Sequence, residues 1–229
     1  MRPIAVATTA ALLLSLAACT QRSDTVAHDL ATAPADAFMA AIAAHCGQAY
    51  VGKVVEDTPA PTAKDPFAGQ RLVMHVRGCA DPAHELRIPF HVGDDHSRTW
   101  VLTRTPNGLR LKHDHRHEDG SPDDEGNEGN EGNEDGSPDA ITLYGGDSTP
   151  PGTAERQQFP ADADSVAMFR RADMLASTHN TWAMEIDPDQ TFVYELTRPD
   201  GRRFRVQFDL SKPVDLPPPQ WGDDTATAP

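Results

Sequence analysis

Residues 181–210 read TWAMEIDPDQTFVYELTRPDGRRFRVQFDL, and this stretch decides the fold. Apolar and polar residues alternate through it in three short runs. Alternation with a period of two is typical of strands that bury one face. Pro199-Asp200-Gly201 supplies turn residues between the last two runs. The stretch therefore predicts antiparallel strands joined by hairpins, with these residues facing inward: Trp182, Met184, Ile186, Phe192, Tyr194, Leu196, Phe204, Val206, Phe208 and Leu210.

Earlier parts of the chain repeat the alternation. Helix-like runs at 36–45, with Asp36 as the cap and Gly47 as the end, and at about 164–174 interrupt it. We predict a mainly β fold, an antiparallel meander of about nine or ten strands with one N-terminal and one late short helix. Closure into a barrel removes the sheet edges, and the pattern resembles that of calycin barrels. The other inward residues are expected to be Leu72, Met74, Val76, Leu86, Ile88, Phe90, Trp100, Leu102, Leu109, Leu111, Ile141 and Leu143.

Composition divides the chain into one domain and its flanks. Residues 36–212 form the predicted barrel domain, 19–35 a flexible tether and 213–229 a disordered tail. Within the domain, 118–139 contains the same six residues twice, separated by Glu-Gly-Asn repeats. A position that tolerates such an expansion is expected to be an exposed loop tip, so we predict a disordered acidic insert there.

The net charge of −15 reflects mainly this acidic insert. Ten of the 35 acidic residues lie in 118–139, which leaves 25 acids against 20 Lys and Arg residues elsewhere. No basic stripe is present that could neutralise phosphates, so the sequence argues against nucleic acid as a partner.

Cys46 and Cys79 form an even pair once Cys19 is set aside. In an oxidising compartment the pair predicts a disulfide. A thiol metal or redox site is the alternative, although no Cys-x-x-Cys spacing is present.

Residues 1–18 have an early Arg2 and an apolar run, the layout of a secretory signal peptide. Leu16-Ala17-Ala18-Cys19 closes this run and resembles the lipobox of bacterial lipoproteins. The resemblance implies a lipidated, palmitate-carrying Cys19 that anchors the protein to the membrane. We also expect the protein to be a monomer. Thr20 follows where inner-membrane retention signals place Asp, which implies the periplasmic side of the outer membrane. No later apolar run reaches the ~20 residues of a membrane-spanning helix.

His113, His115 and His117 alternate at the end of a strand-like run and should share its inward face. Two imidazoles at this spacing can bind one divalent transition metal, with Glu118, His75 or His91 as a third ligand. The motif is similar to that of cupins, with a shorter gap before the Glu. The alternatives are a polar barrel rim and general acid–base use. No cofactor is required by the sequence.

No catalytic set emerges from the other clusters. Asp94, His96 and Ser97 are chain neighbours in a predicted turn, whereas catalytic triads gather from separate segments. The sequence thus favours a binding protein over an enzyme, with a small or partly apolar ligand. The alternatives are a metal-dependent enzyme and an envelope structural or protein-interaction lipoprotein. Candidate ligand-binding residues, which could instead be core, are Trp100, Trp182, Tyr194 and Phe204.

Several runs also resemble an uncharacterised family of secreted proteins of Gram-negative bacteria. The resemblance spans most of 45–212 and implies no activity or site. The runs that carry it are Cys46-Gly47-Gln48, Arg98-Thr99-Trp100, 112–120, Tyr144-Gly145-Gly146-Asp147 and 180–185.

Overall fold

The computed structural model describes residues 33–60, 65–122, 141–149 and 152–223. The acidic insert beyond Pro122, the signal peptide and Cys19 lie outside these ranges. The elements are α1 (Pro34–Ala43), β1 (Gln48–Thr58), β2 (Leu72–Val76), β3 (Glu85–Val92), β4 (Asp95–Thr105), β5 (Gly108–His115), β6 (Tyr144–Asp147), β7 (Arg156–Pro160), α2 (Ala163–Arg171), a 3-10 turn η1 (Leu175–His179), β8 (Thr181–Asp187), β9 (Thr191–Thr197) and β10 (Arg203–Val214).

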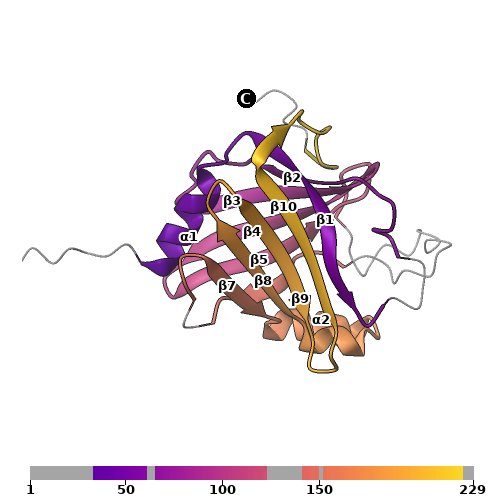
Figure 1. The fold of residues 1–229 in the computed structure, drawn as a ribbon. Coiled ribbons are helices and arrows are strands. Elements are labelled where there is room, and N and C mark those ends of the chain that lie inside the picture. Colours follow the sequence, from indigo (N-terminus) through magenta and orange to yellow (C-terminus); the bar gives the residue numbers. More distant parts are fainter. Residues whose placement is uncertain (1–32, 61–64, 123–140, 150–151, 224–229) are drawn as a thin grey trace, which may run out of the picture. The chain divides into compact units, whose positions relative to one another are not determined.

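All ten strands belong to one antiparallel sheet in the order β6-β5-β4-β3-β2-β1-β10-β9-β8-β7. Each strand lies beside its neighbour in the chain, and β1 pairs with β10. The sheet curls into a nearly closed barrel whose interior holds the apolar core (Figure 1). The predicted mainly β meander with an early and a late helix is confirmed. In the part of the chain that the structure describes, no helix is long and apolar enough to cross a membrane.

The sheet edges β6 and β7 meet along a seam. Asp162 N donates to Gly145 O at 2.9 Å, and Thr149 N donates to Gln158 O at 3.0 Å. Ser165, in the first turn of α2, accepts from Gly145 N at 2.8 Å and donates to Gly145 O at 3.0 Å. Backbone groups at the edges are thereby paired, and α2 is fixed against the seam.

The close approach at this seam leads to a first prediction. A Cβ on Gly146 would lie 1.9 Å from Pro160 O, so Gly146→Ala must force β6 away from β7. We expect a loss of about 1–3 kcal/mol in the free energy of unfolding, as for other overpacked sites. Urea titration measures it. Asp147→Ala, which removes only an exposed pair with Arg110, should cost less than about 1 kcal/mol. Equal stability of G146A and the parent protein would contradict the tight seam.

Both helices start earlier than their patterns indicated. α1 begins at Pro34 with Ala33 as N-cap, so the prediction of Asp36 as the cap was wrong. Asp36 lies in the first turn instead and pairs with Arg104 of β4. α2 begins at Ala163, and its cap is the carboxylate of Asp162, which accepts from Ser165 N. α1 buries Phe38, Met39 and Ile42 in the core, among other residues.

Two other details differ from the sequence expectations. Leu143, expected to face inward, is 53% exposed with φ of 58°, because the chain turns there before β6 begins. The domain also continues past 212. β10 runs to Val214, Trp221 N donates to His96 O, and Asp223 pairs with Arg77 at 2.6 Å. The chain just after β10 therefore lies against the outer face of β2–β4.

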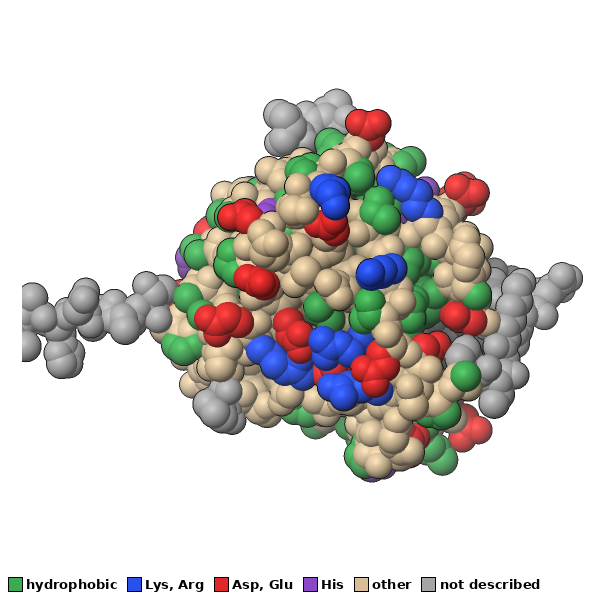
Figure 2. Space-filling view, in the orientation of Figure 1, with side chains coloured by type: hydrophobic (Ala, Val, Ile, Leu, Met, Phe, Trp, Pro, Cys, Tyr) green, Lys and Arg blue, Asp and Glu red, His purple; other side chains and the backbone are tan. Residues whose placement is uncertain are grey.

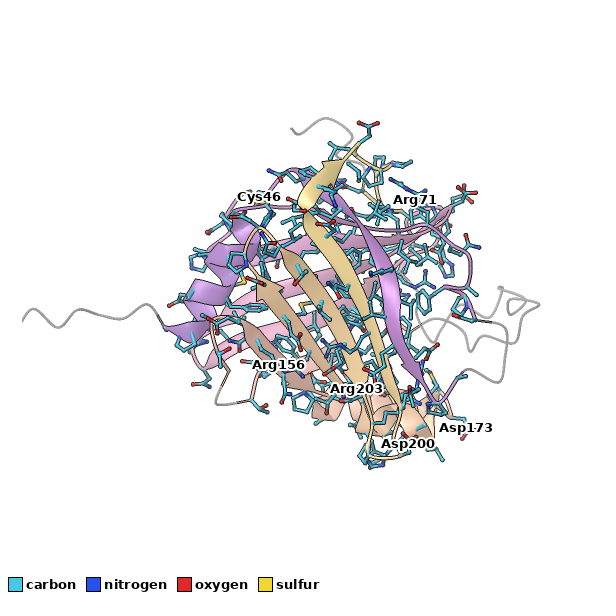
Figure 3. The ribbon with its side chains drawn as sticks, viewed as in Figure 1. Cys46, Arg71, Arg156, Asp173, Asp200 and Arg203 are labelled. Atoms are coloured by element: carbon cyan, nitrogen blue, oxygen red, sulfur yellow. A yellow bond between two sulfur atoms is a disulfide. The ribbon has the colours of Figure 1, made fainter. Side chains whose placement is uncertain are left out.

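Cys46 and Cys79 form the predicted disulfide, 33 residues apart in sequence. Cys46 follows α1, at the end of the barrel where Figure 3 labels it. Cys79 follows β2, so the bond ties the α1–β1 connection to the β2–β3 loop.

Removal of this bond gives a second prediction. The double variant Cys46→Ala/Cys79→Ala should unfold about 3–4 kcal/mol more easily, because the unfolded chain regains the entropy of a closed loop. Urea unfolding of oxidised parent, reduced parent and variant measures this. Reduced parent and variant should agree, and a loss below about 1 kcal/mol would contradict the prediction.

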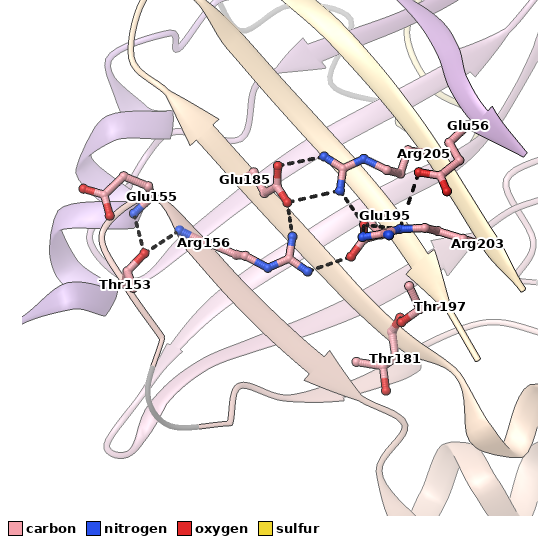
Figure 4. Close-up of polar contacts among 10 residues, drawn as sticks. All are labelled: Glu56, Thr153, Glu155, Arg156, Thr181, Glu185, Glu195, Thr197, Arg203 and Arg205. Atoms are coloured by element: carbon pink, nitrogen blue, oxygen red, sulfur yellow. Dashed lines mark hydrogen bonds and ion pairs between the residues drawn. The ribbon is translucent and has the colours of Figure 1, made fainter. Parts of the chain in front are cut away.

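The outer face of β7–β10 carries a compact ion-pair network. Figure 2 shows cationic and anionic side chains gathered in one patch, and Figure 4 shows their contacts. At its centre, the carboxylate of Glu195 is buried on the outside of the barrel, 1% exposed. The surrounding residues are Arg156, Arg203, Arg205, Glu185 and Glu56.

Candidate functional site: a cavity at one end of the barrel

Strand parity places a mixed set of side chains inside the barrel. Trp100 of β4 pairs with His113 of β5, and Arg98 pairs with His115 two residues along. Since alternate residues share a face, all of these side chains point inward. The outward residues between them form ion pairs: Lys112 with Asp162, and Asp114 with Arg87 and Arg116. The predicted inward direction of His113 and His115 therefore agrees with the geometry.

These side chains border a cavity of about 160 Å³. Its walls come from β3, β4, β5, β6, β9 and the start of β10, with contributions from the β1–β2 and β9–β10 connections. The lining residues are Phe67, Phe90, Arg98, Thr99, Trp100, His113, His115, Tyr144, Tyr194, Leu196, Arg202 and Phe204.

The deep wall is a polar pair surrounded by aromatic rings. His113 Nε2 lies 2.8 Å from Tyr194 Oη, and His113 Nδ1 lies 3.2 Å from Tyr144 O. A carbonyl can only accept, so the proton of neutral His113 is on Nδ1, and Nε2 accepts from the Tyr194 hydroxyl. Burial raises the pKa of Tyr194, which keeps this hydroxyl protonated. Both nitrogens of His113 are thereby occupied.

Flat apolar faces form the rest of the wall. Trp100 stacks on Tyr194 with ring centroids 4.6 Å apart and on Phe90 at 4.9 Å. Phe67 contacts Phe204 with ring centroids 4.8 Å apart. Stacking covers part of these faces, so the rings present their edges and their remaining open faces to a bound group. The cavity can therefore accept a planar apolar body.

Two arginines flank the aromatic walls. The side chains of Arg98 and Arg202 are 25% and 23% exposed, whereas Trp100 is 2% exposed. Arg98 Nη1 donates to Asp95, and Arg202 Nη1 donates to Asp57. The accepting carboxylates do not line the cavity, and no Asp or Glu is among its described lining residues. The lining thus presents two guanidinium groups at its more exposed end, each paired with a carboxylate outside the lining.

The histidines of the cavity are neutral at neutral pH. Burial lowers the pKa of His113 to about 3, and His115 adds to the effect. Burial together with the nearby Arg98 guanidinium lowers the pKa of His115 to about 4. The positive charge of the cavity therefore resides on the arginines alone.

The expected metal ligands do not gather. His113 uses both nitrogens, His115 Nε2 lies 3.2 Å from Tyr144 Oη, and His117 follows the end of β5. His75 and His91 lie on the outer face, near His96. Among the described residues, no three His, Cys, Asp or Glu side chains are placed to hold a metal ion. In this part of the chain, the metal hypothesis has no geometric support.

Three of the four candidate ligand-binding residues line the cavity: Trp100, Tyr194 and Phe204. Trp182 does not, because it lies behind His113, with ring centroids 5.0 Å apart. Sequence reasoning did not identify Phe67, Arg98, Tyr144 or Arg202 as lining residues. Arg98 could have been identified, because it lies two residues before Trp100 on the same strand and therefore shares its inward face. Phe67 and Arg202 lie in connections between strands, where no periodic pattern indicates the direction of a side chain.

No protein-family model matches this chain, and neither a curated protein nor a solved structure is significantly similar to it. The resemblances to bacterial lipoproteins and to secreted Gram-negative proteins therefore remain predictions. The functional argument rests on the cavity itself.

Proposed function

We propose that this chain is a lipid-anchored, periplasm-facing β-barrel that binds a small ligand with a planar apolar body. The observation that carries the proposal is the cavity of about 160 Å³ between aromatic rings. An apolar cavity of similar size, about 150 Å³, accommodates one benzene ring. The cavity therefore has room for a one-ring compound.

The walls favour binding because they are already formed. Trp100, Tyr194 and His113 are held by stacking and by the hydrogen bonds described above. A ligand therefore orders few side chains when it enters, which limits the entropic cost of binding.

Saturation-transfer NMR with benzamide and benzoate as one-ring probes tests the proposal. We expect saturation to pass from the protein to at least one probe. Leu196→Trp, which adds a large ring to the cavity wall, should abolish the signal. Leu216→Trp makes the same change at a residue that is 58% exposed and should leave the signal intact. No transfer to either probe, or equal transfer in both variants, would reject the cavity as a binding site.

The anchoring part of the proposal depends on Cys19 and is tested separately. Metabolic labelling of the full chain in a Gram-negative host with radioactive palmitate should label the parent protein and not Cys19→Ala. Membrane fractionation should place the labelled protein in the outer membrane. A label that persists in the variant would contradict lipidation at this residue.

A further inference from the structure

We infer that the ligand is a one-ring aromatic acid, bound with its ring against Trp100 and Tyr194 and its acid group at Arg98 and Arg202. This inference rests on the proposed function and names the class of compound that the cavity takes. It follows from where charge lies in the lining, from how the arginines are held, and from the gradient of burial.

The sign of the charge comes first. The described lining contains two arginines, two neutral histidines and no carboxylate. An anionic group entering from the exposed side meets two guanidinium groups, and their paired carboxylates, Asp95 and Asp57, lie outside the lining. A cationic ligand would meet like charges in the same place. Because the arginines are partly removed from water, they should discriminate strongly between anionic and cationic ligands.

Hydrogen-bonding capacity comes second. Arg98 uses only Nη1, for Asp95, among its contacts with described residues. Arg202 likewise uses only Nη1, for Asp57 and the carbonyls of Thr58 and Pro59. Nε and Nη2 of both guanidinium groups remain as donors. A guanidinium fixed by one carboxylate is already oriented and can bind a second one through its other edge.

The third observation is the gradient of burial, which sets the orientation of the ligand. Trp100, His113 and Tyr194 are 2%, 4% and 8% exposed, whereas both arginine side chains are about a quarter exposed. The apolar part of a ligand gains most from the buried end, and its charge is least desolvated beside the arginines. The ring therefore enters first, and the acid group stays at the mouth.

Benzoate, benzamide and benzamidine provide the test, because they share one shape and carry negative, zero and positive charge. Their dissociation constants are measured on the full protein by NMR titration at low and high salt. We expect benzoate to bind at least about tenfold more tightly than benzamide, with benzamidine weakest, because charged hydrogen bonds contribute more than neutral ones. Added salt should weaken the binding of benzoate but not that of benzamide or benzamidine.

Matched variants locate the effect. Arg98→Gln and Arg202→Gln should each reduce the preference for benzoate over benzamide about tenfold while benzamide affinity is kept. Arg98→Lys and Arg202→Lys keep the positive charge and should retain part of the preference for benzoate. Because these two substitutions alter the fold least, they separate loss of charge from loss of structure. Arg110→Gln, at an outward ion pair with Asp147, is the control and should change nothing.

The outcomes separate the two proposals. Equal affinities for the three probes, or a preference that survives both Gln substitutions, would overturn the aromatic-acid inference and leave cavity binding in place. Absence of binding by all three probes would overturn both.

Discussion

Acidification from about pH 7.5 to about pH 5 should reduce the free energy of unfolding by several kcal/mol. Burial is the main cause that lowers the pKa of His75 and His115 to about 4 and that of His91 and His113 to about 3. In the unfolded chain, these side chains titrate near the ordinary value of about 6.5. Below that pH the unfolded state binds more protons than the folded state, so stability falls as pH falls.

The expected size is about 1–2 kcal/mol for each of the four histidines at about pH 5. Total stabilities of domains are only about 5–15 kcal/mol, so the barrel should be close to unfolding there. The surroundings reinforce the effect. His91 lies near His96, His75 and Arg77, with Asp95 as an opposing charge, and His113 lies near His115 and within the electrostatic influence of the outward Lys112.

Urea titrations across this pH range measure the loss. The slope of unfolding free energy against pH reports how many protons the chain takes up when it unfolds. His75→Gln and His91→Gln should each reduce that number by up to one. His84→Gln is the matched control, because His84 is exposed and pairs with Asp81. A stability that is constant between about pH 7.5 and pH 5 would show that the buried histidines do not resist protonation.

Replacement of Glu195 by Ala should reduce stability by about 3 kcal/mol, at the lower end of the range for broken buried ion pairs. Its carboxylate accepts from Arg156 at 2.6 Å, from Arg203 at 3.0 and 3.1 Å, and from Arg205. Without it, three guanidinium groups would share Glu185 and Glu56. Repulsion among the arginines is moderated because they are partly exposed.

Neighbouring acids of the same network provide the controls. Glu185 and Glu56 have side chains that are 29% and 37% exposed, so their replacement by Ala should cost about 1 kcal/mol or less. Burial raises the pKa of Glu195, but hydrogen bonds from Arg156 and Arg205 outweigh it and leave the pKa lowered. Its contribution is therefore present above the ordinary carboxyl pKa and lost at lower pH. An E195A protein as stable as E56A would contradict the central role of Glu195.

Strand alternation could be read from the sequence wherever one face of a strand is uniformly apolar. That condition holds for β8–β10 and for most of β2–β5, and their inward residues were identified correctly. It fails for β1, which leaves Val51 and Val55 more than a third exposed, and for β7, where Gln157 is buried beside Phe159. Pairing with neighbouring strands, a nonlocal effect, determines these two strands.

The site was only partly readable for the same reason. Parity predicted that Trp100 and His113 share the interior, but not that His113 would bond Tyr194, 81 residues away. Arg202 reaches the cavity from a hairpin turn, and Phe67 reaches it from a connection. The burial of Glu195 depends on three arginines from two strands, β7 and β10. Such features arise from barrel closure and have no local pattern.

Titration of the isotope-labelled protein with benzoate, followed at the indole NH signals of its three tryptophans, tests the central claim most directly. Trp100 lines the cavity, Trp182 lies behind its deep wall, and Trp221 contacts His96 on the outside of the barrel. Binding in the cavity predicts a large saturable shift for Trp100, a smaller one for Trp182 and none for Trp221. Unchanged Trp100 and Trp182 signals, or a shift confined to Trp221, would contradict a ligand site inside the barrel.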